Sequence, residues 1–267
     1  MSALVYTLSD SATMLRRNLL RLRRYPSLTL LLVGMPIVFL LLFVYVFGGQ
    51  LGHGLDTSLT GGRSGRAGYL DYVTPGILLM TVAAAVQGTA IVVAMDMTGG
   101  IVDRFRTMAI ARSAVLTGHV LASLIQAALS LGIVLGVAVA LGFRPGAGPL
   151  AWLGAVGVLA LFSLALIWLA TALGLAARSV ETASNTPMFL TLLPFLGSGF
   201  VPDASMPTGL RQFAHYQPFT PVTETLRGLL TGTPIGADAV TAVAWSLAIA
   251  LASYLWARRL YARKRSA

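Results

Sequence analysis

Six stretches of this chain contain no charged residue, and each is long enough for a helix that crosses a lipid bilayer. They hold between 19 and 33 residues, against the roughly 20 apolar residues that such a helix needs. The stretches are Tyr25–Leu55, Tyr72–Met95, Ser113–Phe143, Pro145–Ala177, Thr182–Pro202 and Ala239–Ala257. They lack the alternation of a barrel strand, the other backbone arrangement that lipid permits. The pattern predicts an all-α polytopic membrane protein with six transmembrane helices.

The composition supports a membrane protein and excludes several kinds of functional site. Of the 267 residues 56% are hydrophobic and 10% are charged, and the mean hydropathy is +0.80, which is atypical of a soluble domain. The chain has no cysteine, so disulfides, thiolate metal sites and cysteine nucleophiles are excluded. Arginine outnumbers lysine 18 to 1, a bias typical of a high-GC bacterial genome. We therefore expect the bacterial cytoplasmic membrane as the location.

The basic residues set the expected orientation of the spans. We place the spans at about residues 28–47, 72–95, 116–143, 150–177, 182–201 and 239–257. Threading them alternately puts 14 basic residues on the side of the two termini and 5 on the opposite side. The positive-inside rule then predicts both termini in the cytoplasm. A nucleic-acid surface is disfavoured because these charges directly flank apolar spans.

Residues 1–27 are predicted to form an amphipathic helix at the cytoplasmic membrane surface. Ser9, Asp10 and Ser11 are candidate N-caps and Pro26 would end the helix, while Leu15, Leu19 and Leu22 share one face among five arginines. The alternative is that these arginines only set the topology. No cleavable signal pattern precedes the first span, so we expect that span to be retained as an anchor.

Two loops differ in character. Residues 48–68 are rich in glycine and weakly polar, which predicts a flexible external loop. The loop of residues 96–114 is amphipathic, with Ile101, Phe105 and Met108 on one helical face and Asp103, Arg104 and Arg106 around them. It is too short to span and too charged to be buried. A short helix under the bundle, on the cytoplasmic side, fits it best.

The fifth span and the segment after it are unusual. Pro187 and Pro194 interrupt the apolar run, so its helix is expected to be kinked or short. Residues 202–238 are too apolar for a loop in free solvent. Thr220-Pro221 and Gly232 supply start and stop signals for a helix over Pro221–Thr231. We expect an external re-entrant helical hairpin over 202–238, and the alternative is a loop that rests on the headgroups.

The sequence contains no self-contained catalytic or energy-coupling motif. The phosphate-loop pattern is absent, and the only lysine is Lys264 in the basic cytoplasmic tail of residues 258–267. His53, His119 and His215 lie outside any metal-ligand pattern, so no metal site is predicted. Gly197-Ser198-Gly199 hints at a serine nucleophile, but it lacks the full pattern and a convincing base. No charged residue lies near the middle of a span, which disfavours ion-coupled transport. Energy for any transport should therefore come from a partner.

Two segments resemble a known family. The segment Gly100–Met108, continued by Ala111–Gly118, resembles the cytoplasmic loop of daunorubicin-resistance-type ABC transporter permeases, with departures at Ala109 and His119. A second set resembles the pattern that precedes the last span in type-2 exporter permeases. It comprises Ser198–Pro202, Met206-Pro207, Gln217-Pro218, Thr220–Val222 and Leu226-Arg227. Together with the six-span topology the resemblance covers nearly the whole chain.

The resemblance implies a half-transporter without catalytic residues of its own. Two permease copies, in a homodimer or a heterodimer with a sister permease, would dock two separate cytoplasmic ATPase subunits, which would bind ATP and Mg. Residues 28–257 would form the permease domain. The ATPase-coupling residues would be Asp103, Arg104, Phe105, Arg106 and Met108. An external gate would comprise Pro202, Pro207, Pro218, Pro221, Glu224 and Arg227, in which Glu224 and Arg227 are spaced to pair.

We therefore expect an ATP-driven exporter permease for hydrophobic or amphipathic drugs or lipids. Scattered hydrogen-bonding groups in apolar spans suit such substrates better than ions, and the predicted substrate path comprises Thr81, Gln87, Gln126 and Thr191. One alternative is export of a lipid-linked glycan or glycolipid. An alternative from another class is a membrane scaffold or channel that couples to no ATPase.

Overall fold

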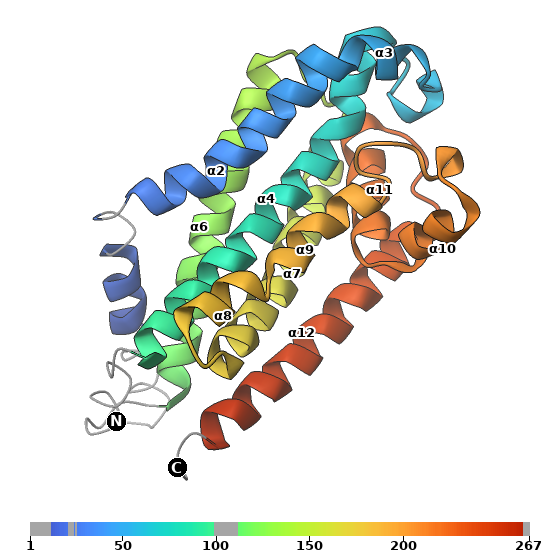
Figure 1. Cartoon of the computed structure of the whole chain (residues 1–267). Helices are drawn as coiled ribbons and strands as arrows, with labels where there is room; N and C mark the ends of the chain where they lie inside the picture. The colour runs from blue at the N-terminus through green and yellow to red at the C-terminus, as the bar shows by residue number, and fades with distance from the viewer. Residues whose placement is uncertain (1–11, 21–23, 25, 99–111, 264–267) are drawn as a thin grey trace.

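The computed structural model describes residues 12–20, 24, 26–98 and 112–263, and Figure 1 shows them as a bundle of helices. No residue of these ranges lies in a strand. Within them, five helices are long and apolar enough to cross a membrane. They are Leu32–His53, Gly65–Thr98, Leu116–Ala140, Pro149–Ala176 and Asp238–Ala262. The all-helical fold is confirmed.

The elements follow the predicted order. After a helical stretch at residues 12–20 they are α2 (Pro26–Leu41), η1 (Leu42–Phe47), α3 (Gly48–His53), η2 (Thr57–Leu59), α4 (Gly65–Thr98), α6 (Arg112–Ala140), α7 (Pro149–Ala176), α8 (Val180–Asn185), α9 (Met188–Leu192), η3 (Leu193–Leu196), η4 (Asp203–Ser205), α10 (Thr208–Tyr216), α11 (Phe219–Thr231) and α12 (Asp238–Arg263). Helix α4 begins seven residues before the predicted second span. The described part of the N-terminal amphipathic helix is helical, as predicted.

Helix α4 forms the centre of the bundle and contacts α2, α6, α7, α8 and α11. Small residues let its neighbours approach closely. A Cβ atom on Gly174 of α7 would lie 2.7 Å from the carbonyl oxygen of Ala90, and one on Gly76 would lie 2.5 Å from that of Gly199. Helix packing in lipid depends on such contacts because burial from water supplies little driving force there.

The predicted fifth span is divided into α8, α9 and η3, with Pro187 and Pro194 at the two breaks. The kink expected from these prolines is confirmed. The segment runs antiparallel to α4: Gln87 Nε2 donates to the carbonyl of Ser184, and Tyr72 Oη donates to that of Ser198. Proline removes a backbone donor and clashes with the preceding turn, so one straight helix cannot form here.

Residues 48–68 do not form the flexible loop predicted from their glycines. They fold into α3 and η2, followed by a turn in which Thr60 Oγ1 donates to the carbonyl of Arg63. Arg63 Nη1 then lies 2.8 Å from Oδ2 of the buried Asp71 at the start of α4. The prediction is wrong because this ion pair anchors the segment to α4, and composition does not register such a contact.

The segment before α12 folds into two helices, α10 and α11. Gly232, with φ +77°, ends α11 as predicted. The helix begins at Phe219, two residues before the predicted start, with Pro218 as its N-cap. Pro221 fits inside the first turn because the amide groups there need no intrahelical acceptor. Helix α11 is buried, whereas Leu210, Phe213 and Tyr216 of α10 are exposed.

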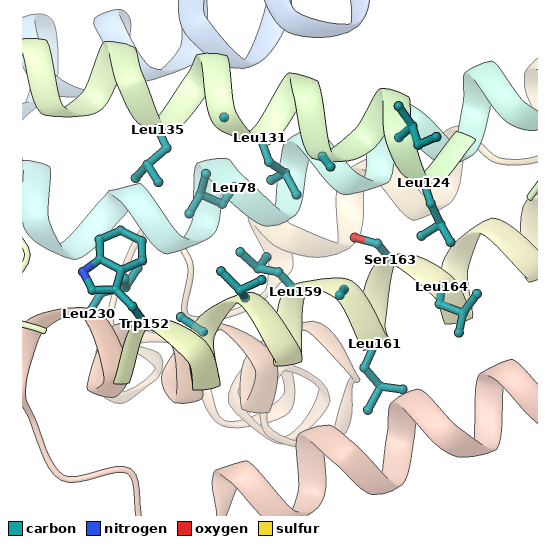
Figure 2. Close-up of a pocket in the computed structure, with 16 residues that line it drawn as sticks. Leu78, Leu124, Leu131, Leu135, Trp152, Leu159, Leu161, Ser163, Leu164 and Leu230 are labelled. Atoms are coloured by element: carbon teal, nitrogen blue, oxygen red, sulfur yellow. The ribbon is translucent and has the colours of Figure 1, made fainter. Parts of the chain in front are cut away.

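The two ends of the bundle differ. In Figure 1 residues 12–20 lie at the same end as the last turns of α12, and α3 and α10 lie at the opposite end. Between α6 and α7 the bundle leaves a groove of about 750 Å³ with an apolar lining (Figure 2).

Candidate functional site

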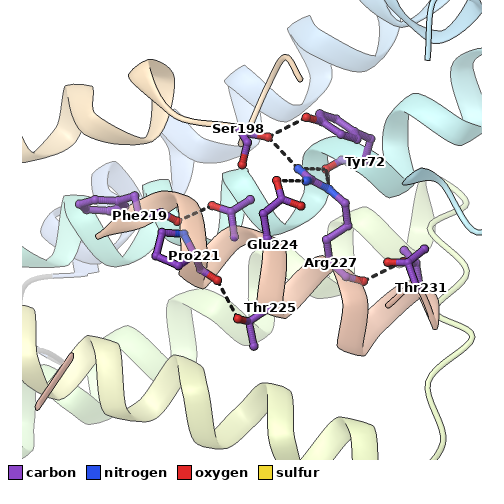
Figure 3. A network of polar contacts seen from close by, with 10 residues as sticks. Tyr72, Ser198, Phe219, Pro221, Glu224, Thr225, Arg227 and Thr231 are labelled. Atoms are coloured by element: carbon purple, nitrogen blue, oxygen red, sulfur yellow. Dashed lines mark hydrogen bonds and ion pairs between the residues drawn. The ribbon is translucent and has the colours of Figure 1, made fainter. Parts of the chain in front are cut away.

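Arg227 is a buried cation on α11 that joins three segments (Figure 3). Its side chain is only 2% exposed, and its guanidinium group stacks over the ring of Tyr72, with the central carbon 3.7 Å from the ring centroid. Nη2 donates to the carbonyl of Ser198 at 2.8 Å, and both Nε and Nη2 point to the carbonyl of Tyr72 at 3.4 and 3.3 Å. The guanidinium group therefore ties α11 to α4 and to the end of the broken fifth segment.

Glu224 supplies the opposite charge for this cation. Its Oε1 accepts a hydrogen bond from Arg227 Nη1, and its side chain is 28% exposed. The predicted pairing of Glu224 with Arg227 is confirmed. The planar, always charged guanidinium group suits this position because it satisfies several acceptors at once and also stacks on an aromatic face.

The backbone at the end of the broken segment is satisfied by side chains from outside it. Tyr72 Oη donates to the Ser198 carbonyl at 2.8 Å, Tyr69 Oη to that of Phe200 at 3.1 Å, and Gln217 Nε2 to that of Leu193 at 3.0 Å. Non-helical backbone at membrane depth is tolerated only where protein covers it and supplies partners. These contacts therefore explain how the fifth segment can break inside the bundle.

The other predicted gate residues are spread around this network. Pro202 precedes η4, Pro207 is the exposed N-cap of α10, and Pro218 is the half-buried N-cap of α11. Pro221 is buried in α11, where its carbonyl accepts a hydrogen bond from Thr225 Oγ1 at 2.7 Å. The prolines thus mark the boundaries of the two helices, while Arg227 makes the contacts that hold α11 in the bundle.

A second charged cluster lies at the opposite end of α4. Asp96 is buried, and its Oδ2 accepts a hydrogen bond from Arg17 Nη2 at 2.6 Å. Nε2 of the buried His119, on α6, lies 3.2 Å from the same oxygen. Close packing supports the contact, since a Cβ on Gly118 would lie 2.6 Å from that of Met14. The cluster of Arg17, Asp96 and His119 joins the 12–20 helix to α4 and α6.

The five predicted ATPase-coupling residues, Asp103, Arg104, Phe105, Arg106 and Met108, lie outside the described residues. Their segment connects the two helices that carry Asp96 and His119. The charged cluster is therefore close in sequence to both ends of the predicted coupling loop.

The four predicted substrate-path residues do not gather in one cavity. The Thr81 and Thr191 hydroxyls donate to carbonyls of their own helical turns, at Ile77 and Met188. Gln87 holds α8 to α4, and Gln126 lies half-buried on α6. The described groove between α6 and α7 is lined by none of the four.

The arrangement supports packing and ion pairing and offers little for bond chemistry. Among the described residues no group of three or more His, Cys, Asp or Glu could hold a metal ion. Ser198 Oγ is buried and makes no hydrogen bond in the described part of the chain. The tyrosine and arginine around Ser198 bind its carbonyl oxygen and leave the hydroxyl without a base.

Sequence reasoning missed Tyr69, Tyr72 and the Arg17–Asp96–His119 cluster. A signal for the tyrosines existed in the sequence: Arg227 lies between Leu226 and Leu230 in a segment too apolar for free solvent, so this cation needed acceptors from elsewhere in the chain. No signal in the sequence paired Arg17 with Asp96, because 79 positions separate them.

Comparisons with known proteins give one matching family and relatives of modest identity. The model of a family described as ABC-2 type transporter matches residues 11–231. The daunorubicin resistance ABC transporter permease protein DrrB1 of Streptomyces coeruleorubidus is 29% identical over 226 residues, which cover 84% of this chain and 76% of that protein. The probable doxorubicin resistance ABC transporter permease protein DrrC of Mycobacterium tuberculosis is 24% identical over 175 residues. This second match covers 64% of this chain and 63% of the relative.

Proposed function

The chain belongs to the ABC-2 type transporter family, and from that premise we propose that it is the membrane-spanning permease subunit of an ATP-driven exporter. Its cargo would be hydrophobic or amphipathic molecules such as drugs or lipids. The substrate class is carried over from the relatives, whose names record resistance to daunorubicin and doxorubicin. The permease would contribute the path through the membrane and would catalyse no reaction itself.

The observation that carries this proposal is the family match over residues 11–231, which includes four of the five long apolar helices. In the described spans the charged residues lie toward the helix ends, as Asp71 and Asp96 do in α4. An ion-coupled transporter would be expected to hold an ionisable group at mid-depth. ATP hydrolysis by separate subunits is therefore the better energy source. We propose two such ATPase subunits and two permease copies, with ATP and Mg bound by the ATPases.

The export proposal is tested in inverted vesicles that contain this chain and its ATPase subunit. We expect ATP-dependent uptake of daunorubicin, abolished when ATP is replaced by a non-hydrolysable analogue. Uptake of a lipid-linked sugar with no response to daunorubicin would favour a glycan exporter. A chain that co-purifies with no ATPase and moves neither substrate would favour a scaffold or channel.

We propose six membrane crossings with both termini in the cytoplasm of a bacterial cell. The 14-to-5 distribution of basic residues favours this orientation. The antiparallel path of α8, α9 and η3 along α4 supports a sixth crossing. Its contacts run from Gln87 of α4 back to Tyr69, a distance of roughly 27 Å at 1.5 Å per residue. That distance is close to the thickness of the hydrocarbon core, about 30 Å.

Cysteine labelling tests this topology, because the chain has no native cysteine. Ser64 is exposed in the turn before α4, so the S64C variant should react with a membrane-impermeant maleimide in intact cells. Glu181 is exposed at the opposite end of the bundle and serves as the control, since E181C should react only after permeabilisation. The reverse labelling pattern would contradict the proposed orientation.

We propose that the loop of residues 96–114 docks in the ATPase, with Asp103, Arg104, Phe105, Arg106 and Met108 at the contact. The F105A variant removes the largest apolar side chain of that group. At an interface hot spot this truncation costs on the order of 2 kcal/mol, or about a thirtyfold loss of ATPase affinity. Titrating the ATPase onto the purified permease measures the loss. Unchanged affinity with unchanged export would show that this loop is not the docking element.

A further inference from the structure

The groove between α6 and α7 has an apolar lining closed at its base by two other helices. Leu78 of α4 and Leu230 of α11 form its floor, and Trp152 stands at one end (Figure 2). Its volume of about 750 Å³ lies within the range of small-molecule sites, which is about 300–1,000 Å³. Exposed aliphatic side chains of α6 and α7 line its sides, among them Ile125 and Val156.

Two polar groups interrupt this lining, the indole nitrogen of Trp152 at one end and the hydroxyl of Ser163. Ser163 of α7 is 3% exposed, and its Oγ makes no hydrogen bond to any described residue. Figure 2 shows this hydroxyl between α6 and α7, facing into the groove. Thr171 on the same helix shows the usual arrangement, in which the hydroxyl donates to the carbonyl four residues earlier. Ser130 Oγ of α6 is also buried without a partner among the described residues, but Ser130 does not line the groove. A buried hydroxyl without a partner is unfavourable, so its presence in an apolar groove indicates a missing acceptor or donor.

The depth of Ser163 in the membrane limits which molecules could supply the missing hydrogen-bond partner. It is the fifteenth of the 28 residues of α7, and therefore lies near the middle of the span. Lipid headgroups and bulk water do not reach that depth, and an acyl chain offers no hydrogen-bonding atom. A molecule that satisfies Ser163 must carry a polar group together with an apolar body large enough to fill the groove.

We propose that this groove binds an amphipathic small molecule that enters from the bilayer, with its apolar body between α6 and α7 and a hydroxyl, carbonyl or amine hydrogen-bonded to Ser163 Oγ. This inference rests on the proposed export function and assigns a binding site for its substrate within one permease copy. The site and the network around Arg227 share helix α11, because Leu230 of the groove floor lies three residues after Arg227. A molecule bound in the groove would therefore contact α11, the helix that Arg227 holds against α4.

Two glycines of α6 provide a matched test. Gly132 lines the groove, and a Cβ on it would meet nothing within 4 Å, so the G132L side chain can occupy the groove without disturbing the helix backbone. Gly136 is one turn further along α6, is equally open, and is not part of the lining. The G136L variant therefore adds the same side chain, with the same gain in helix propensity, outside the groove.

The probe is daunorubicin, titrated against the full-length chain in phospholipid nanodiscs with its fluorescence as the readout. We expect saturable binding to the unaltered chain, a Kd at least tenfold higher for G132L, and a Kd within twofold of the original for G136L. The S163A variant removes one hydrogen bond and should raise the Kd by about three- to tenfold. Trp152 should report the same binding through quenching that is lost in W152F.

Several results would overturn the site. Equal Kd values for G132L, S163A and the unaltered chain would place the drug elsewhere. If G132L instead removes co-purifying phospholipid, or converts a dimer to a monomer, and leaves the Kd unchanged, the groove holds a lipid or a second copy. Export by the vesicles described above separates this inference from the proposed function. Unimpaired export by G132L would reject the groove as the substrate site but not the export function. Absence of both binding and export in the unaltered chain would reject both proposals.

Discussion

Replacing Arg227 with alanine is expected to be among the most damaging single changes in this chain. The substitution removes the stacking on Tyr72 and the hydrogen bonds to the carbonyls of Tyr72 and Ser198, and it leaves Glu224 without its cation. Breaking a buried ion pair by deleting one partner typically costs about 3–5 kcal/mol. We expect a loss of that order in the free energy of unfolding, measured by denaturation of the purified chain in detergent, together with loss of export.

Two further variants serve as controls for R227A. R227K keeps the charge, but an ammonium group has neither the planar fork nor the stacking surface, so it should recover less than half of the lost stability. R259A removes an exposed arginine of α12 and should change the free energy of unfolding by less than about 0.5 kcal/mol. An R227A variant as stable as the unaltered chain would show that α11 is held by its apolar contacts alone.

Replacing Asp96 with alanine is expected to have the second largest effect. Asp96 is the shared acceptor of the cluster with Arg17 and His119, and its side chain is 4% exposed. Because the Arg17 side chain is about one-third exposed, water takes over part of its solvation in the variant. We therefore expect a smaller loss than for R227A, about 2–3 kcal/mol in the free energy of unfolding.

Protease cleavage of the N-terminal helix tests whether the cluster of Arg17, Asp96 and His119 holds this helix in place or only adds to general packing. The D96A variant loses the ion pair that joins Arg17 to α4, so protease cleavage within residues 12–20 should accelerate before the whole chain unfolds. D96N keeps one acceptor oxygen and should fall between the alanine variant and the unaltered chain. D56A, which removes an exposed carboxylate that caps Ser58, should leave cleavage unchanged. Equal cleavage of D96A and D56A would exclude a role for the cluster in holding this helix.

Much of the fold could be predicted from local features of the sequence. Five of the six predicted spans match long apolar helices, namely Leu32–His53 and helices α4, α6, α7 and α12, because a charge-free run of sufficient length has few alternatives to a helix in lipid. Gly232 and the prolines of the fifth segment act on the backbone of their own turns, and for that reason the end of α11 and the breaks around α9 were also predictable. The pair of Glu224 with Arg227 followed from a spacing of three residues on one helix.

The contacts of these residues with the rest of the chain required the tertiary structure. The helical spacing of Arg227 predicted Glu224, but Tyr72 and the carbonyl of Ser198 lie 155 and 29 positions away. Asp96 likewise lies 79 positions from Arg17 and 23 positions from His119. Arg63 and Asp71 are only eight positions apart, but the fold of the turn between them forms their ion pair and orders a segment that was expected to be a flexible loop.

The class of the protein, the number and order of its apolar segments and the uneven distribution of basic residues between the segments that connect them were therefore determined by the sequence alone. These properties depend on composition summed over about 20 neighbouring residues, and folding does not change them. The tertiary structure decided which polar groups are buried together and where the groove with Ser163 opens between α6 and α7. Those features depend on which helix faces meet, and many arrangements of the same helices would satisfy the same apolar pattern.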